Sequence, residues 1–337
     1  MKITIKDVAK KAGVSPGTVT RALNGYIDIK EETKLRILNV VQELGYVASN
    51  SARNLSAKTN DNIGVFVFGL MQEGRLNEFS NEVIHGVYNY LGNKDISVFV
   101  HFFDNQIQEE HRLKEFMDRY NINGVIMIGL KTGDYYLNHL EELKRPCVLI
   151  DVEANSGLVS SVLTNEVEAF YDITSYVLRK KHSDIILVYG RIQSEVALKR
   201  NEGFLKALEE FGITTNNIDT IFSDFSREET YQAVKDYILE NKKNKNTTFV
   251  CMSDLTAIGV YKAVLELGYR IPEDFSVTGF DGIKFGECVF PMLTTVYSDF
   301  IKKGEYAAEL LYKMIRSGKK QDSIYVPYKL IIRDSIS

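Results

Sequence analysis

The sequence predicts a small all-α head followed by a large α/β body of two lobes. Residues 1–47 contain three short helical patterns and no strand pattern. From residue 63 onward, almost continuous apolar runs alternate with amphipathic stretches, which is typical of buried parallel strands connected by helices. With 337 residues, the chain is long enough for two or more domain cores. We therefore expect a helical head and two lobes with parallel sheets flanked by helices.

The first helix of the head is predicted from its capping residues. The sequence TIKD at 4–7 has the form of a capping box, in which Thr4 and the acid three positions later satisfy each other's backbone donors. Val8, Ala9 and Ala12 follow on one face, and Gly13 is a typical helix end.

The second helix is predicted within SPGTVTRALNG at 15–25. Ser15 is a good N-cap, and Pro16 suits the first helical position because its missing N–H costs nothing there. The Asn-Gly pair at 24–25 is a stop signal. A third helix is expected over residues 31–44, ending at Gly45. A helix, a short turn, a second helix and a packing helix form a helix-turn-helix arrangement, whose second helix enters the DNA major groove.

Charge is divided unevenly between the head and the body. The whole chain carries −4, but residues 1–60 hold ten Lys/Arg and five Asp/Glu, which gives +5 and leaves −9 for the remainder. A basic head on an acidic body indicates that the head meets an anion. Residues 47–60 between them are small and polar, as expected of a linker.

The body is expected to bind its ligand where its strands end, because ligands of open α/β sheets lie at the carboxyl ends of the strands. The expected strands are the apolar runs at 63–69, 96–101, 124–129, 147–151, 184–190, 247–252 and 275–280. The expected helices cover 78–91, 109–120, 166–179, 198–211, 226–241 and 254–267. The residues at the strand ends are Gly69, Gly129, Asp151, Gly190, Ser253, Asp254 and Asp281.

Several classes of protein are disfavoured by what the sequence lacks. It has no run of 18 apolar residues and no N-terminal signal segment, so we expect a cytoplasmic protein without a membrane partner. The three cysteines, Cys147, Cys251 and Cys288, are widely spaced, as reduced thiols would be. We find no HExxH, P-loop or GxSxG motif and no metal-type spacing of the five histidines, so we expect no catalysis, no metal and no cofactor.

The chain resembles the lac-repressor/galactose-repressor (LacI/GalR) family. The matching stretches are TIKDVAKKAGVSPGTVTRALNG, the helix ending ELGYV, RNEGF at 200–204, SDLTAIG at 253–259, GYRIPEDFSVTGFDG at 268–282 and PMLTT at 291–295. The resemblance implies a helix-turn-helix domain at 1–47, a hinge at 48–60 and an effector-binding and dimerisation domain at 61–337, similar to periplasmic sugar-binding proteins.

The resemblance also implies which residues meet DNA. The base contacts fall on Pro16, Gly17 and Arg21, and phosphate contacts on Ser15, Thr18 and Thr20. Pro16 and Gly17 offer no hydrogen-bonding side chain, so Arg21 should carry more of the discrimination through a guanine edge.

Three further DNA contacts are expected outside the second helix. Thr4 lies at the start of the first helix, whose backbone N–H groups suit a phosphate. In the hinge, Leu55 matches the residue that the family inserts into the minor groove, with Ala52 beside it. The alternative for Leu55 is a linker residue that packs on the body.

In the body, the resemblance implies effector contacts at Asp151, Arg200, Phe225, Ser253 and Asp281. Carboxylates and Arg would bind sugar hydroxyls, and Phe225 would stack on the ring. The family commonly has Asn where this chain has Ser253. The structural alternatives are an Asp helix cap and an Arg–Asp ion pair.

Phe79 is a further candidate for the opposite side of the ring, although an aromatic early in an amphipathic helix is more often a core residue. We expect a cytoplasmic homodimer that binds a palindromic double-stranded operator and represses carbohydrate-utilisation genes under control of a small sugar. The alternatives are a nucleobase or phosphoprotein co-repressor with the same DNA-binding role, or a sugar-binding protein that does not bind DNA.

Overall fold

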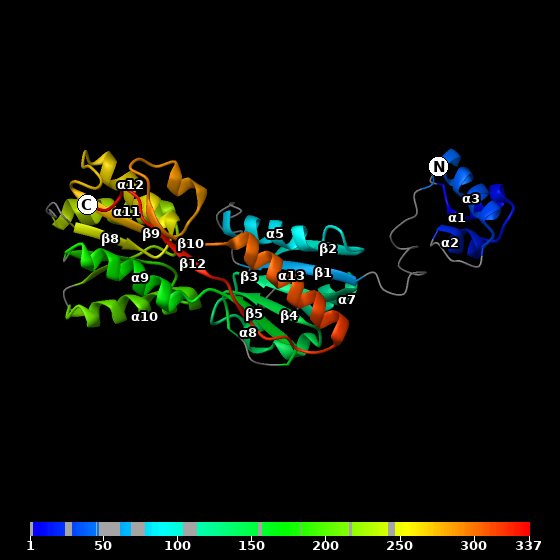
Figure 1. The fold of residues 1–337 in the computed structure, drawn as a ribbon, viewed down its shortest axis with the longest axis horizontal. Helices are drawn as coiled ribbons and strands as arrows, with labels where there is room; N and C mark the ends of the chain where they lie inside the picture. The colour runs from blue at the N-terminus through cyan, green and yellow to red at the C-terminus, as the bar shows by residue number, and fades with distance from the viewer. Residues whose placement is uncertain are drawn as a thin grey trace. The chain divides into compact units, whose positions relative to one another are not determined.

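The computed structural model describes residues 3–23, 29–44, 46, 61–68, 78–103, 113–153, 157–182, 184–215, 218–241 and 247–337. The chain forms two compact units, Met1–Asp61 and Asn62–Ser337 (Figure 1). The stop signals at 24–25 and Gly45, the expected hinge at 48–60 and the strand end at Gly69 lie outside the described residues.

The first unit contains the three helices predicted for the head. They are α1 (Ile5–Ala12), α2 (Pro16–Leu23) and α3 (Glu31–Leu44). Gly13 ends α1 with φ 66°, the left-handed conformation expected of a C-terminal glycine. One core holds the helices together, formed by Val8, Ala9, Ala12, Val19, Ala22, Ile37 and Val40.

The second unit consists of two α/β lobes (Figure 1). The sheet of the first lobe has the order β11-β5-β4-β3-β1-β2. Its strands are β1 (Asp61–Phe68), β2 (Ile96–Phe103), β3 (Ile122–Ile128), β4 (Cys147–Ile150), β5 (Val159–Leu163) and β11 (Ile324–Tyr325). Its helices are α5 (Glu78–Leu91), α7 (Leu113–Arg119), α8 (Tyr135–Asn138), the 3-10 helix η1 (Leu140–Leu143) and α13 (Phe300–Ser317).

The sheet of the second lobe has the order β12-β10-β9-β8-β6-β7. Its strands are β6 (Ile185–Tyr189), β7 (Asp219–Phe222), β8 (Thr247–Cys251), β9 (Phe275–Asp281), β10 (Thr294–Ser298) and β12 (Tyr328–Ile331). Its helices are α9 (Glu166–Arg179), α10 (Glu195–Glu210), α11 (Arg227–Asn241), α12 (Asp254–Glu266) and the 3-10 helix η3 (Lys284–Glu287). Strand β12 pairs antiparallel with β10, whereas β6, β7, β8, β9 and β10 pair in parallel.

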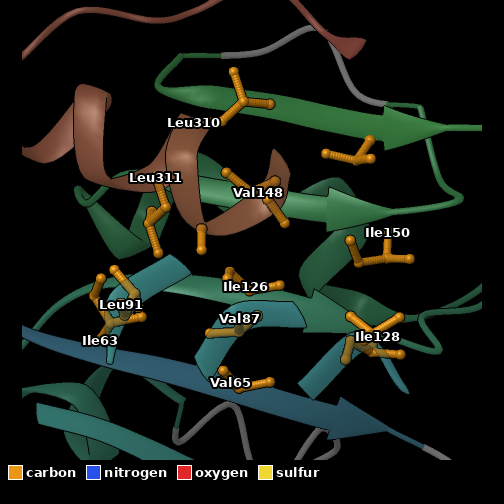
Figure 2. Close-up of a cluster of buried hydrophobic side chains, with 14 of the residues drawn as sticks. Ile63, Val65, Val87, Leu91, Ile126, Ile128, Val148, Ile150, Leu310 and Leu311 are labelled. Carbon is orange, nitrogen blue, oxygen red and sulfur yellow. The ribbon is translucent and has the colours of Figure 1, made fainter. Parts of the chain in front are cut away.

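Both faces of each sheet are covered by helices, which explains the continuous apolar runs in the sequence. In β1, Ile63 and Val65 face a core shared with α5 and α13, while Phe66 faces a core shared with α7. Figure 2 shows the first of these cores, where Val87 of α5 and Leu311 of α13 lie over the strands. The second lobe repeats the arrangement with α9 and α10 on one face and α11 and α12 on the other.

The chain crosses between the lobes three times, after β5, after β10 and after β11. Two of these crossings touch, because the hydroxyl of Thr164 lies 3.1 Å from that of Ser298 and both side chains are buried. The last helix along the chain, α13, therefore belongs to the first lobe, where it packs along α5.

Some element boundaries differ from those expected. The helix expected at 198–211 begins earlier, at Glu195, and Leu113–Arg119 replaces the described part of the one expected at 109–120. The three cysteines are free thiols. None of the helices in the described ranges is long and apolar enough to cross a membrane.

Candidate DNA-binding helix and effector site

The start of α2 is built by its own capping contacts. The backbone N–H of Thr18 donates to Ser15 Oγ at 3.1 Å, and the two hydroxyls lie 2.9 Å apart. The hydroxyl of Thr20 donates to the carbonyl of Pro16 at 3.0 Å. The hydroxyls that the resemblance assigns to phosphates thus also hold the first turn of the helix in place.

The exposed face of α2 carries the three residues expected to meet bases. Pro16, Gly17 and Arg21 are exposed, while Val19 and Ala22 are buried against the other two helices. A methyl group added at Gly17 would have only Ser15 Oγ within 4 Å, at 3.7 Å. Nothing in the packing of the described residues therefore requires glycine here, although glycine costs about 1 kcal/mol in a helix relative to alanine.

The capping box of α1 is present as predicted. The backbone N–H of Thr4 donates to Asp7 at 2.8 Å and its hydroxyl donates to the same oxygen at 2.6 Å. These hydrogen bonds from Thr4 lower the pKa of Asp7 below its usual value. The two predicted hinge contacts, Ala52 and Leu55, lie outside the described residues.

In the second lobe, Arg200 is the centre of a buried polar cluster. Its Nε donates to Glu166 at 2.7 Å, and one terminal nitrogen donates to Asp281 at 3.1 Å. The other terminal nitrogen donates to the carbonyl of Met252, and the guanidinium lies 3.7 Å from the centre of the Phe280 ring. Since Arg200 is only 6% exposed, its charge is balanced by the chain itself, with Glu166 as a partner that the sequence did not suggest.

The carboxylate of Asp281 ends β9 in an unusual backbone conformation. Its φ is 109°, and burial raises its pKa to about 6, with Glu166 acting in the same direction against Arg200 and Lys303. Behind it, the fully buried Asp254 accepts the backbone N–H of Ile283 at 2.8 Å and the hydroxyl of Thr295 at 2.6 Å. Asp254 thus fixes the loop that follows Asp281 and has a structural role.

Ser253 and Phe225 lie next to this cluster. Ser253 is the N-cap of α12, where its hydroxyl accepts the N–H of Thr256 at 3.2 Å. Phe225 is half-buried, and its ring covers Gly190, where a methyl group would come within 2.2 Å of the ring. The N–H of Gly190 points at the sulfur of Met252 at 3.5 Å, which connects the ring to the Arg200 cluster.

The remaining predicted effector residues, Asp151 and Phe79, lie in the first lobe. Asp151 follows β4 with φ 58°, and both its oxygens accept from Lys303 Nζ, at 2.6 and 2.8 Å. Phe79 packs edge-on against Phe300 with ring centres 4.9 Å apart, and Lys303 lies 5.3 Å from the same Phe300 ring. The structure therefore groups the predicted residues by lobe, Asp151 and Phe79 in one, and Arg200, Phe225, Ser253 and Asp281 in the other.

The two lobes contact each other beyond the carboxyl ends of their strands, on the side where both groups lie. Beyond β3, the Thr132 hydroxyl donates to the carbonyl of Gln193 beyond β6 at 3.0 Å. The N–H of Lys284, beyond β9, donates to Glu78 of α5 at 3.1 Å. Such contacts between strand ends are where an α/β protein of this kind accommodates a ligand.

Comparison with known proteins decides the family. A model of bacterial regulatory proteins of the lacI family matches residues 4–49, and a periplasmic binding protein-like domain matches residues 174–336. The HTH-type transcriptional repressor PurR of Serratia proteamaculans (strain 568) is 30% identical over 337 residues, spanning 99% of this chain and 97% of the relative. The chain belongs to the LacI family.

Further similarities agree with this membership. The probable HTH-type transcriptional repressor ExuR of Bacillus subtilis (strain 168) is 29% identical over 99% of this chain and 98% of its own length. The lac repressor dimer bound to operator and the anti-inducer ONPF shares the fold, with a TM-score of 0.86 at 22% identity over 100% of both chains. A LacI-family regulator from Enterococcus faecium with bound ribose has a TM-score of 0.71 at 26% identity, over 82% of this chain and 99% of that one.

As a LacI-family protein, the chain is a sequence-specific DNA-binding transcriptional regulator, as the helix-turn-helix pattern of the head predicts. Glu166 and Lys303 are the polar residues of its body that sequence reasoning missed. Glu166 begins α9, where an acid is ordinary, so it gave no signal. The sequence did carry a signal for Lys303, because this lysine falls three residues after Phe300 on the apolar stripe of α13 that continues through Ala307.

Proposed function

We propose that this protein is a repressor of carbohydrate-utilisation genes that binds a palindromic operator as a homodimer and responds to a small sugar. In this proposal residues 1–47 bind DNA, 48–60 form the hinge, and 61–337 bind the effector and dimerise. The observation that carries the proposal is the Glu166–Arg200–Asp281 cluster, which lies beside a half-exposed aromatic ring at the carboxyl ends of the strands.

The chemistry of the cluster suits a sugar. A guanidinium has five N–H donors, of which Arg200 uses three on Glu166, Met252 and Asp281, so two remain for hydroxyl oxygens. Asp281 gives one oxygen to Arg200, which leaves its second oxygen to accept from a hydroxyl. Phe225 supplies an apolar face for the C–H groups of the ring.

The head supports the DNA side of the proposal. The exposed face of α2 would enter the major groove, with Arg21 reading a guanine edge and the first turn meeting phosphates. Thr4 would add a phosphate contact at the start of α1. A palindromic operator follows from two-fold symmetry, since each protomer of a dimer brings one head to one half-site.

Control of DNA binding would come from the two lobes. A ligand held by groups of both lobes favours the arrangement in which those groups are close, and it shifts the equilibrium only by its differential affinity for the two arrangements. The three chain crossings between the lobes would carry such a shift through the body. We propose that the sugar weakens operator binding, so that the regulated genes are induced.

The test begins with the operator. The full-length protein is used to select binding sequences from a pool of random double-stranded DNA, and its affinity for the selected duplex is measured by fluorescence anisotropy. Neutral sugars, sugar phosphates, uronic acids and nucleobases are then added in turn. We expect a palindromic duplex that is released by one class of sugar.

Two variants divide the two activities. Arg21→Ala should lose discrimination for the duplex but keep the thermal shift caused by the sugar. Asp281→Asn should still bind the selected duplex but should no longer release it when the sugar is added. Glu202 is an exposed acid on the helix that carries Arg200, so Glu202→Gln should keep both the duplex binding and the sugar response. Tighter DNA binding on addition of a nucleobase, with no response to any sugar, would replace the sugar by a nucleobase co-repressor, which the relatives named PurR make a specific alternative.

A further inference from the structure

Lys303 is the most deeply buried charged side chain of α13, with 1% of the residue exposed. Its neighbour Lys302 is in the same helix, but its side chain is 45% exposed and pairs with Glu305 at the surface. The two lysines therefore differ in burial, and of the two only Lys303 points into the body. Its ammonium reaches Asp151 at the end of β4 at 2.6 and 2.8 Å.

This buried ion pair is costly and does not by itself make the fold more stable. Replacing a buried ion pair by apolar side chains of similar volume is often neutral or stabilising, because two charges must be removed from water. Position 303 lies on an apolar stripe between Phe300 and Ala307, where an aliphatic side chain would pack without that cost. The backbone of Asp151 adds a further free-energy cost, since its φ of 58° is unfavourable for a residue with a side chain.

The pair lies in the lobe opposite the Arg200 cluster, and the chain segments that carry the two sets touch. The hydroxyl of Thr164, two residues before Glu166, lies 3.1 Å from that of Ser298, two residues before α13 begins at Phe300. In agreement with this contact, the charge of Lys303 lowers the pKa of Asp281, and the charge of Asp151 raises the pKa of Arg200. Together the two sets contain two cations, Arg200 and Lys303, and the three carboxylates Asp151, Glu166 and Asp281.

The charge balance of this set distinguishes between classes of ligand. Both cations are already paired with carboxylates of the chain, and one negative charge is left over. A ligand carboxylate or phosphate would add a second negative charge to a poorly solvated site. A neutral hydroxylated ring adds none, and it can use the hydrogen-bonding capacity that remains, which includes the third N–H of Lys303.

We propose that the Asp151–Lys303 pair is the first-lobe half of the effector site, and that it selects an uncharged polyhydroxylated ligand against acidic or phosphorylated sugars. The inference rests on the proposed function, since it concerns the same site. In it, Lys303 donates to a ligand hydroxyl while Asp151 holds the ammonium in place and keeps the site from attracting anions.

The test compares ligands that differ only in charge. Dissociation constants are measured by calorimetry on the full-length protein for neutral hexoses and pentoses, and for the uronic acid and the sugar phosphate that correspond to each. We expect a neutral sugar to bind at least tenfold more tightly than its two charged derivatives. Tighter binding of either derivative would overturn the selection for an uncharged ligand.

Variants then test Lys303 itself. Lys303→Met alone leaves Asp151 buried without its partner, so the double variant Asp151→Asn/Lys303→Met removes both charges and is expected to fold. We expect it to bind the neutral sugar at least tenfold more weakly, with an unliganded melting temperature equal to or above that of the native protein. Lys302→Met, the matched control on the same helix, should change the affinity less than twofold. Unchanged affinity in the double variant would assign the pair a purely structural role and overturn the proposal.

The outcome also separates this inference from the proposed function. If no sugar of any charge binds and only a nucleobase does, the sugar-responsive function fails and this inference fails with it. If a sugar binds and releases the operator but prefers the charged form, the proposed function stands and only this inference is wrong.

Discussion

A methyl group at position 304 would test the close packing of α13 on α5. These helices cross at two glycines, Gly86 and Gly304, where their backbones touch. A Cβ atom built at Gly304 would lie 2.0 Å from the carbonyl oxygen of Val83 and 3.0 Å from the Cα of Gly86. Both obstacles are backbone atoms, so no side chain can rotate away to relieve the contact.

The cost follows from this distance. Because Cβ contacts below 3.0 Å essentially never occur, Gly304→Ala must separate the helices locally by about 1 Å or more. Overpacking of this kind typically costs about 1–3 kcal/mol, while the better helix propensity of alanine returns about 1 kcal/mol. We expect a net loss of about 1–2 kcal/mol, together with weaker effector binding, because α13 also carries Lys303 and Phe300.

The assay is urea denaturation of the full-length protein, followed by circular dichroism, with Gly133→Ala as the control. A Cβ at Gly133 would meet nothing within 4 Å, and its φ lies outside the left-handed range. This variant should therefore be neutral or slightly more stable, by about 0.4–1 kcal/mol. If Gly304→Ala were as stable as the native protein, the helices would not be in backbone contact and the reasoning would be refuted.

Four further variants test the head and the site. Thr4→Ala removes the capping box and should lower the stability of the head by about 1 kcal/mol, measured by thermal melting of residues 1–61. Gly17→Ala should stabilise the same head by up to about 1 kcal/mol, yet weaken operator binding in anisotropy, because the added methyl would lie on the face that we propose enters the major groove. Arg21→Ala should cost about 1–3 kcal/mol of discrimination between the operator and a duplex changed at one guanine. Because burial raises the pKa of Asp281 from 3.8 to about 6, its carboxyl takes up a proton on folding between these values, so stability falls as pH rises from about 4 to 6. Asp281→Asn should remove up to roughly 3 kcal/mol of that fall, measured by urea denaturation from pH 4 to 7.

Contrary results for Gly17→Ala, Arg21→Ala and Asp281→Asn would each overturn one part of this reasoning. Equal operator affinity for native protein and Gly17→Ala would mean that the glycine does not serve a close approach to DNA. Loss of the sugar response in Arg21→Ala would contradict the separation of head and body. An identical pH profile for Asp281→Asn would show that this carboxyl is not the group that titrates near pH 6.

The fold could be predicted from the sequence wherever local signals agree with tertiary packing. The capping box at Thr4 and the glycine at 13 both appear in α1 as expected. In the body, a continuous apolar run identifies a strand covered on both faces, as in β1. The local sequence does not predict which strands are neighbours in a sheet, because α13 and β11 return to the first lobe from the end of the chain.

The candidate site could be predicted less completely. Arg200 and Asp281 stand in recognisable motifs, and the structure joins them by a hydrogen bond. Glu166 and Lys303 stand in none, since an acid at a helix start and a lysine pair are ordinary surface features. Their role depends on burial, which a single sequence reveals only through a periodic stripe such as that of α13.

The late position of α13 in the chain sets the order in which the protein can fold as it leaves the ribosome. The head needs only contacts within its first 61 residues, so it can form early. The first lobe has most of its strands by residue 163, but on the face that α5 shares with α13, the part over β3, β4 and β5 lacks its helix until residues 300–317 emerge. In the meantime the apolar side chains of β3 and β4 under α13, such as Ile126 and Val148, are open to other chains. Slow synthesis between residues 163 and 300, or truncation before α13, should therefore promote aggregation of this lobe rather than yield a free, functional half.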